Sequence, residues 1–142
     1  MLTLTKTSYG FRAVARGTLT VADLARALLT FRRLAPDAGG FGYLYDQRGV
    51  AAMSTEVQAK VRELMAQLLE GGVERVAIIC SSTVRAGQSN ARLDGTPAAR
   101  FSHAFDGQDP RWRTDAMAWV SAAATLDRRS PLGPLAEVDQ AA

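Results

Sequence analysis

The sequence is poor in the residues that build disulfides and metal sites. Its 142 residues include a single cysteine, Cys80, and a single histidine, His103. One cysteine excludes an internal disulfide framework and a multi-cysteine zinc or iron–sulfur site, and one histidine offers no histidine pair for a metal. We therefore expect no metal and no cofactor. The scarcity of cysteine suits a reducing compartment and predicts a cytoplasmic protein.

Long apolar runs and concentrated charge are also missing. No apolar stretch approaches the roughly 18 residues that a membrane span needs, and residues 1–6 lack the pattern of a signal peptide. The 17 lysines and arginines and 14 acidic residues give a net charge of only +3. Arg32–Arg33 and Arg128–Arg129 are the only adjacent arginines, so the basic stripe of a nucleic-acid surface is absent. We expect neither a membrane span nor nucleic-acid binding.

Three common kinds of catalytic motif are absent from the sequence. It has no glycine-rich phosphate loop with a lysine, no carboxylate set of the glycosidase type and no nucleophile spaced with a base. Cys80 ends an apolar segment, which favours an inert core thiol over a reactive one. His103 alternates with Phe101 and Phe105, which favours an ordinary sheet histidine over a ligand or proton-transfer group. We predict a protein without catalytic residues that is not an enzyme.

The chain that is present has the composition of one globular domain. Hydrophobic residues make up 47% of it and charged residues 22%, and its length is close to that of a typical domain. We expect residues 1–124 to form this domain. From Thr125 onward the periodicity is lost and Pro131 and Pro134 interrupt the sequence, so we predict a flexible tail over 125–142.

Five segments have the patterns of β-strands. The first two form a predicted hairpin that turns at Ser8-Tyr9-Gly10, because glycine adopts a positive backbone angle at no steric cost. The third is an aromatic run that we expect to end at Asp46. The fourth contains Ile78 and is continuously apolar in its second half, as in a central parallel strand covered on both faces. The predicted strands span 2–5, 11–17, 41–46, 73–80 and 100–105.

Helical patterns separate these strands. Thr20 and Asp23 form a capping-box pattern before a helix over 21–34, which Pro36 and Gly39-Gly40 end. Ser54 is placed to cap a second helix, which Gly71-Gly72 ends. An apolar stripe marks this helix: Val57, Val61, Leu64, Met65 and Leu68.

The later helical segments differ in the strength of their signals. Residues 81–95 are weakly periodic, and we expect a loop and a short helix there. Asp109-Pro110 predicts the start of the last helix. Trp112 and Trp119 share one face of it, which favours core anchors over a partner or lipid surface. The order ββαβαβ(α)βα predicts an α/β domain with a mixed, mostly parallel five-stranded sheet, about four flanking helices and an antiparallel first strand.

Two loops at the ends of strands are candidate binding sites. In open α/β sheets ligands bind beyond the carboxyl ends of the strands, next to helix N-termini. The loop after the third strand and the loop after the fourth offer a carboxylate, two arginines and several hydroxyls, which suit an anion or phosphate. Helix caps and turns use the same residue types, so a purely structural role for these residues is the alternative interpretation. The candidate ligand or partner residues are Asp46, Arg48, Ser81, Ser82, Thr83 and Arg85, with Ser54 beside them.

Segments 11–23, 43–48, 74–79 and 105–120 carry a family resemblance. Their pattern resembles the bacterial SpoIIAA-like proteins, which are related to STAS domains, over roughly residues 1–122. The resemblance implies a mixed sheet flanked by helices and a non-enzymatic regulatory or protein-interaction role. In anti-sigma factor antagonists of this class, a serine at the start of a helix is phosphorylated. The matching position is Ser54, with Thr55 beside it, although Met53 and Glu56 depart from the usual flanking pattern.

Two functions follow from this resemblance. The first is a module that binds a protein partner or a second copy of itself around the start of the second helix. The second is a carrier or sensor of a small lipid or anion that uses the crevice at the carboxyl ends of the strands, with Arg48, Ser54, Ser82 and Arg85. The fold also resembles the lipid-binding CRAL-TRIO domains, which implies a small apolar ligand between helices and sheet. A pocket lined by apolar side chains would favour the carrier, and a flat, exposed helix face would favour the module.

Overall fold

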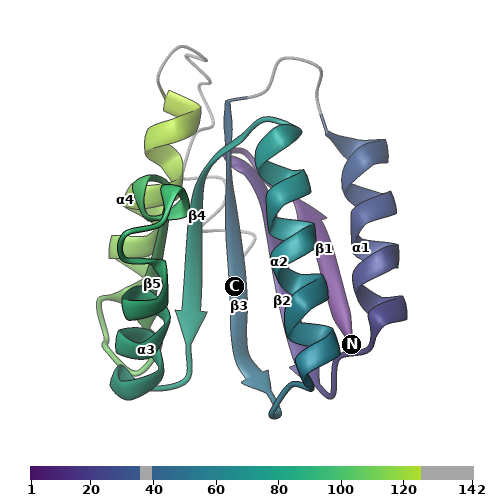
Figure 1. Ribbon diagram of the computed structural model, residues 1–142. Coiled ribbons are helices and arrows are strands. Elements are labelled where there is room, and N and C mark those ends of the chain that lie inside the picture. The colour runs from purple at the N-terminus through teal and green to yellow at the C-terminus, as the bar shows by residue number, and fades with distance from the viewer. Residues whose placement is uncertain (36–39, 126–142) are drawn as a thin grey trace.

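A computed structural model describes residues 1–35 and 40–125 as a five-stranded sheet with helices on both faces (Figure 1). The elements are β1 (Leu2–Lys6), β2 (Gly10–Gly17), α1 (Val21–Leu34), β3 (Phe41–Val50), α2 (Thr55–Glu70), β4 (Val73–Cys80), α3 (Thr83–Leu93), the short 3₁₀ helix η1 (Pro97–Arg100), β5 (Ser102–Asp106) and α4 (Trp112–Thr125).

The strands lie side by side in the order in which they occur along the chain. β1 runs antiparallel to β2, and all other neighbouring strands are parallel. In Figure 1, α1, α2 and α3 lie in front of the sheet and α4 lies behind it. The predicted α/β class, the mixed sheet and the antiparallel first strand are therefore confirmed.

The β1–β2 hairpin turns through Gly10, at the predicted position. Gly10 has a φ of 148°, which residues with a side chain rarely adopt. The backbone amide of Thr7 donates to the Gly10 carbonyl at 2.8 Å, and the Gly10 amide donates to Thr7 Oγ1 at 3.0 Å. A Cβ atom at Gly10 would also collide with the carbonyl oxygen of Gly42 in β3. The turn thus needs glycine for its conformation and for its close approach to β3.

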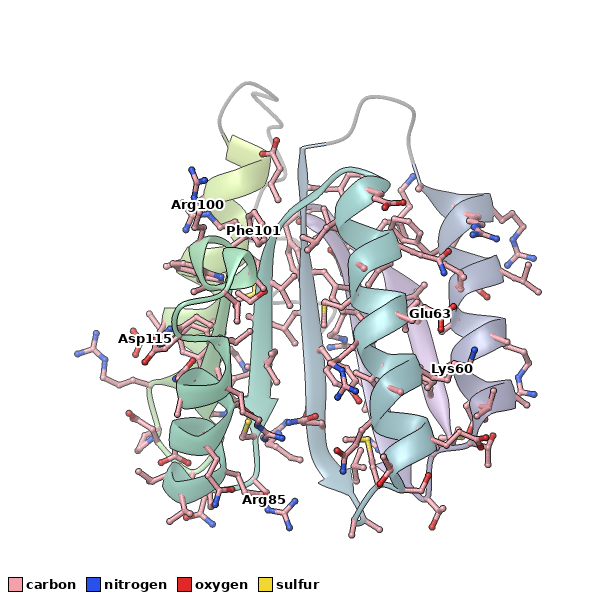
Figure 2. The ribbon with its side chains drawn as sticks, in the orientation of Figure 1. Lys60, Glu63, Arg85, Arg100, Phe101 and Asp115 are labelled. Atoms are coloured by element: carbon pink, nitrogen blue, oxygen red, sulfur yellow. The ribbon has the colours of Figure 1, made fainter. Side chains whose placement is uncertain are left out.

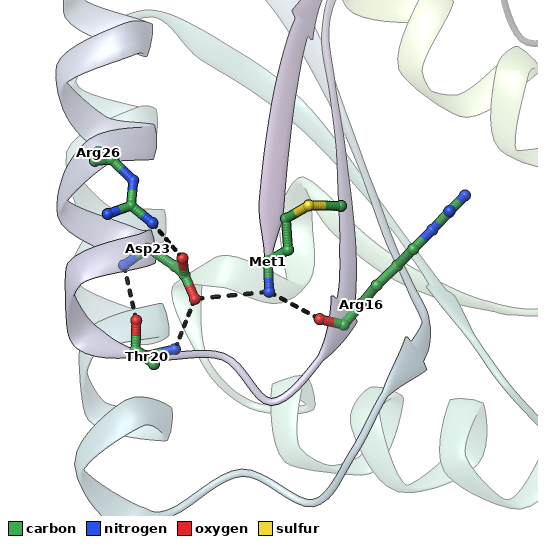
Figure 3. A network of polar contacts seen from close by, with 5 residues as sticks. All are labelled: Met1, Arg16, Thr20, Asp23 and Arg26. Carbon is green, nitrogen blue, oxygen red and sulfur yellow. Dashed lines mark hydrogen bonds and ion pairs between the residues drawn. The ribbon is translucent and has the colours of Figure 1, made fainter.

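The start of α1 is a capping box, as its sequence predicts. Asp23 N donates to Thr20 Oγ1 at 3.1 Å, and Thr20 N donates to the Asp23 carboxylate at 2.9 Å. The same carboxylate pairs with Arg26 at 2.5 Å and lies 3.6 Å from the Met1 amine (Figure 3). These contacts satisfy amides of the first helical turn and fix the connection between β2 and α1.

The front face of the sheet is an aromatic and aliphatic core beneath α1 and α2. The Phe31 ring of α1 packs 5.1 Å from Phe11 of β2 and 5.9 Å from Phe41 of β3, measured between ring centroids. Val57, Leu64 and Leu68 bury the inner face of α2 against the same cluster. The opposite face of α2 carries the exposed ion pair Lys60–Glu63 (Figure 2).

The rear face is covered by α4, which packs on β3, β4 and β5. Val120 and Ala116 are fully buried against Leu44, Ala77 and Ile79. Trp119 packs at the border of this cluster, and its indole Nε1 donates to the carbonyl of Val76 at 2.9 Å. Ile78 alternates with Ala77 and Ile79 on β4, so it faces the front, and β4 is the interior strand that the sequence predicts.

Several predicted boundaries differ from those of the structure. β3 continues beyond Asp46 to Val50, because its last residues pair with the end of β2, where Gly17 lies opposite Val50. α3 is a regular helix of 11 residues, and β5 begins at Ser102 because Pro97–Arg100 form η1. α4 begins at Trp112, and Asp109 instead accepts a hydrogen bond from the Arg111 amide in the preceding turn.

Two of the predicted features fall partly or wholly outside the described residues. The helix-breaking residues Pro36 and Gly39 lie there, and so does the predicted tail beyond Thr125. The division into a domain and a tail stays a prediction. Within residues 1–35 and 40–125, no helix combines the length and apolar character needed to cross a bilayer.

Candidate functional site

A groove opens between α2 and α3 on the front face of the sheet. Its volume is about 450 Å³, and β3, β4 and β5 provide its floor. We call it the α2–α3 groove. Apolar side chains contribute most of its surface: Met53, Val61, Met65, Ala66, Leu69, Ile78, Leu93 and Ala98.

Two hydroxyl groups beneath the groove have no hydrogen-bond partner in the described part of the chain. Tyr45 of β3 and Ser102 of β5 line the groove, and their hydroxyl oxygens are buried without a hydrogen bond to any described residue. Burial raises the pKa of Tyr45 to about 12, and the neighbouring Cys80 and Asp46 act in the same direction. The phenol therefore stays neutral at physiological pH and can both donate and accept. Leaving such a group unpaired costs about 1–3 kcal/mol, which a polar atom of a ligand could recover.

The rim of the groove is polar and positively charged. Arg62 of α2 and Arg92 of α3 line it, and both are exposed. Neither takes part in an ion pair within the described part of the chain, and the Nε of Arg92 donates only to the Gln88 carbonyl at 3.4 Å. A neutral or acidic group at the mouth of the groove would meet this charge favourably, and a cationic group would not.

The groove follows from the unequal sizes of the facing side chains on the two helices. The apolar stripe of α2 is wider than its contact with α1, so Val61 and Met65 remain half-buried and face the groove. α3 buries only the small Ala86, against β4 and β5. Because α3 carries few large apolar side chains, it leaves the space beside α2 unfilled.

Asp46 and Arg48, the first pair of predicted site residues, lie on β3 and not in a loop. Their carboxylate and guanidinium groups form a two-pronged ion pair, with Nε to Oδ1 at 2.9 Å and Nη2 to Oδ2 at 2.7 Å. They share the rear face with Leu44, and the Arg48 guanidinium lies 4.5 Å from the ring centroid of Trp112 in α4. The hydrogen bonds to Asp46 and the charge of its carboxylate raise the pKa of Arg48 above its ordinary value, while partial burial opposes the rise.

The other predicted residues lie at the starts of α2 and α3. Ser54 Oγ accepts from the Val57 amide at 3.2 Å, and Thr55, the first residue of α2, is exposed beside it. Ser82 Oγ accepts from the amide of Arg85 at 3.2 Å. Their helix-capping role accords with the alternative interpretation of these hydroxyls.

The remaining two lie next to these caps. Thr83 Oγ1 donates to Asp106 Oδ2 at 2.5 Å, and Ser81 is half-buried at the end of β4. Arg85 is exposed at the carboxyl edge of the sheet (Figure 2). Among the described residues, no hydrogen bond or ion pair joins Thr83 or Arg85 to Arg48, so the two predicted loops do not form one continuous polar cluster.

Comparison with solved structures finds a match for this arrangement. An uncharacterized protein of the DUF3478 family from Shewanella loihica PV-4, described as having a SpoIIAA-like fold, superposes with a TM-score of 0.57. The aligned region covers 84% of this chain and 92% of that one, at 22% sequence identity. The chain has a SpoIIAA-like fold. No protein-family model matches the sequence, and no curated protein matches it.

In this SpoIIAA-like fold, the sequence predicts some of the groove residues as core residues and gives no prediction for the others. Val61 and Met65 belong to the predicted apolar stripe of α2, and Ile78 to the predicted central strand. Tyr45 and Ser102 gave no individual signal. The available signal was the mismatch between a broad apolar stripe on α2 and an α3 with only two large apolar side chains, Val84 and Leu93, because such a helix leaves the space beside the stripe unfilled.

The remaining singled-out residues have ordinary surroundings. Cys80 is buried, with its sulfur 3.5 Å from the Gln47 side-chain amide and 3.8 Å from Ser89 Oγ. His103 is exposed, and its ring lies 4.8 Å from Phe105 and 5.8 Å from Trp119, between centroids. Within the described ranges, no group of three or more histidine, cysteine or acidic residues is placed to hold a metal ion.

Proposed function

We propose that this chain is a non-enzymatic binding module of the STAS-like class that takes up a small, largely apolar molecule in the α2–α3 groove. The observation that carries the proposal is an apolar groove whose floor contains two buried, unpaired hydroxyl groups, those of Tyr45 and Ser102. Small-molecule sites typically combine a mostly apolar lining with a few polar groups that orient the ligand.

The size and flexibility of the groove support this proposal. Its volume of about 450 Å³ falls in the range of roughly 300–1,000 Å³ that is usual for small-molecule sites. Met53 and Met65 stand on its wall, and methionine adapts its shape easily to different ligands. Arg62 and Arg92 at the rim favour a ligand whose polar end is neutral or acidic. A fatty acid is the simplest ligand with these properties.

A binding titration tests the groove. Fluorescent cis-parinaric acid is titrated into the wild type and into Ala66→Trp, which places an indole in the groove. Ala91→Trp is the matched control, because Ala91 is also an exposed helical alanine but does not line the groove. We expect Ala66→Trp to bind at least about tenfold more weakly, a loss of roughly 1.4 kcal/mol, and Ala91→Trp to match the wild type. Equal affinity for all three proteins would contradict the proposal.

The Tyr45 hydroxyl provides a second test, in which removing a polar group should raise the stability of the unliganded protein. We expect Tyr45→Phe to raise the free energy of unfolding of the unliganded protein by about 1 kcal/mol, because it removes a buried, unpaired hydroxyl. The same change should weaken parinaric acid binding. Urea unfolding and fluorescence titration measure the two effects. A purely structural hydroxyl would give the opposite sign for stability and no change in affinity.

The start of α2 keeps a second proposed role, as a docking surface for a protein partner or a second copy of the chain. Ser54 is exposed there and adjoins Met53, which lines the groove, so a phosphate on Ser54 would alter the surface at the groove mouth. Native mass spectrometry of the protein purified from its host tests both roles together. It reports bound small molecules, the number of subunits and any added phosphate. A single bare subunit would count against this second role.

A further inference from the structure

A second hollow lies on the rear face of the sheet, away from the α2–α3 groove. Its volume is about 150 Å³, and it lies where β2 and β3 meet the first turns of α4. Because α4 packs on β3, β4 and β5, the rear surface of β2 beside it remains open to form one wall. We call this hollow the arginine cleft, because four arginines line it: Arg12, Arg16, Arg48 and Arg113.

The charges in the arginine cleft do not balance. Among the described residues, Asp46 is the only acidic one that lines it, and its carboxylate is already paired with Arg48. Arg12, Arg16 and Arg113 have no ion pair with any described residue. Three arginines with no acidic partner in the described chain therefore line one small hollow, and this arrangement attracts an anion with more than one negative charge.

Arg12 is the best-placed donor of the cleft. It is half-buried on β2, and its Nε atom is buried with no hydrogen-bond partner among the described residues. A buried, unpaired donor on a charged group is costly, and an anionic acceptor would remove that cost. Val14, Leu44 and Met117 supply the apolar lining around it, which strengthens electrostatic attraction by excluding water.

The indole of Trp112 holds two of the other guanidinium groups. The Cζ atoms of Arg48 and Arg113 lie 4.5 and 5.0 Å from its ring centroid, within the range of cation–π contacts. These contacts restrict long, flexible side chains before any ligand arrives. Preorganisation of this kind reduces the entropy lost on binding.

From these observations we propose that the arginine cleft binds one phosphate monoester group. A hollow of about 150 Å³ is smaller than the roughly 300 Å³ at which drug-sized sites begin, so it admits a compact group and not a whole ligand. The planar fork of arginine matches phosphate oxygens, and several such forks match its double negative charge. The group belongs either to a soluble phosphate or to a lipid headgroup. The proposal is independent of the apolar groove on the other face.

The test is a titration with inorganic phosphate at constant ionic strength, followed by the indole signals of Trp112 and Trp119 in ¹H–¹⁵N NMR spectra. Trp112→Phe assigns the two signals. We expect a saturable shift of the Trp112 signal and a smaller shift of Trp119, which lies two turns farther along α4. A shift that rises linearly without saturation would overturn the proposal.

Three variants and one control locate the binding. We expect Arg12→Met to weaken phosphate binding at least tenfold and Arg12→Lys, which keeps the charge, to fall between it and the wild type. Asp46→Asn should strengthen binding severalfold, because it removes the competing carboxylate while keeping an acceptor for the Arg48 amide. Arg33→Met removes an exposed arginine of α1 and should leave binding unchanged. Equal loss in Arg12→Met and Arg33→Met, or weaker binding by Asp46→Asn, would refute the assignment.

Vesicle co-sedimentation identifies the source of the phosphate group. Vesicles of phosphatidylcholine with and without phosphatidic acid, which carries a phosphate monoester, are mixed with the wild type and Arg12→Met. Sedimentation that depends on both phosphatidic acid and Arg12 assigns the cleft to a lipid headgroup. Phosphate binding without such sedimentation assigns it to a soluble phosphate monoester. If the protein attracts anions only adventitiously, Arg12→Met will behave like the wild type in both assays, and this result would count against the cleft.

Discussion

Asp23 shows how a single side chain couples this fold to pH. Its carboxylate is almost buried, and the hydrogen bond from the Thr20 amide lowers its pKa below the ordinary value of 3.8. The Thr20 hydroxyl, the Met1 amine and Arg26 add to this effect, while burial opposes it. A depressed pKa in the folded state means that the unfolded chain takes up the proton first. The stabilisation is therefore present above pH 3.8 and is lost as the pH falls through the lower, folded-state pKa.

Comparing the wild type with Asp23→Asn tests this coupling. Asparagine keeps an oxygen that can accept from the Thr20 amide, but it has no charge to lose. We expect the wild type to be more stable than the variant at pH 7, and the difference to shrink as the pH falls below 3.8. Urea unfolding at a series of pH values between neutral and strongly acidic measures both curves. A difference that stays constant over this range would show that the charge of Asp23 does not stabilise the fold.

At the scale of whole elements, the free edge of β5 is protected by a side chain. Within residues 1–35 and 40–125, β5 is the last strand of the sheet, so one of its edges has no strand partner there. Asn90 of α3 occupies that edge: its Nδ2 donates to the Ala104 carbonyl at 3.0 Å, and its Oδ1 accepts from the Ala104 amide at 2.8 Å. The amide side chain thus imitates a neighbouring strand, which blocks pairing with other chains and ties α3 to the sheet.

We expect Asn90→Ala to lower the free energy of unfolding by about 1–3 kcal/mol, because it leaves both backbone groups of buried Ala104 unpaired. Asn90→Asp keeps only the acceptor, so its free energy of unfolding should lie between those of the wild type and Asn90→Ala. Denaturant unfolding measures stability, and hydrogen exchange of the Ala104 amide should accelerate in the same order. Gln88→Ala, at an exposed position of α3, serves as the control. If Asn90→Ala behaved like that control, the edge would not depend on this clamp.

The strand boundaries show where sequence patterns fail to predict the structure. The sequence around Arg48 predicts a loop because it is polar and contains Gly49, yet this segment is the end of β3. Its backbone pairs there with β2 alone, since the contact with β4 ends at Asp46. Polar side chains are compatible with a strand whose faces are partly exposed to solvent. Alternation of apolar residues detects burial, and it therefore underestimates a strand that extends beyond the covering helices.

At the scale of the whole molecule, layer order was predictable and the hollows were not. The spacing of apolar residues on α1, α2 and α4 and the buried character of β4 were sufficient to predict a mixed sheet covered on both faces. The groove and the cleft each depend on side chains from distant segments, such as Tyr45 with Ser102, and Arg12 with Arg113. A local pattern contains no information about such convergence, because it depends on strand register and on which helices fail to meet.

The attachment of α4 to the rear of the sheet depends on one glycine. Gly42 of β3 is buried, and a Cβ atom there would lie 2.5 Å from the carbonyl oxygen of Val120 and 2.9 Å from its Cβ. Helix backbone cannot give way as a flexible side chain can, so Gly42→Ala must push α4 off the sheet. We expect a loss of about 1–3 kcal/mol in the free energy of unfolding. The Trp119 fluorescence should shift to the red as its hydrogen bond to the Val76 carbonyl weakens.

Gly87→Ala is the matched control for this prediction and should have the opposite sign. Gly87 lies inside α3, where a Cβ atom meets nothing within 4 Å. Alanine is favoured over glycine in a helix interior by roughly 0.5–1 kcal/mol, so this variant should be more stable than the wild type. Denaturant unfolding with tryptophan fluorescence measures both variants under the same conditions. If Gly42→Ala were also neutral or stabilising, α4 would not rest directly on β3, and the rear wall that holds Trp112 beside the arginine cleft would have to be placed differently.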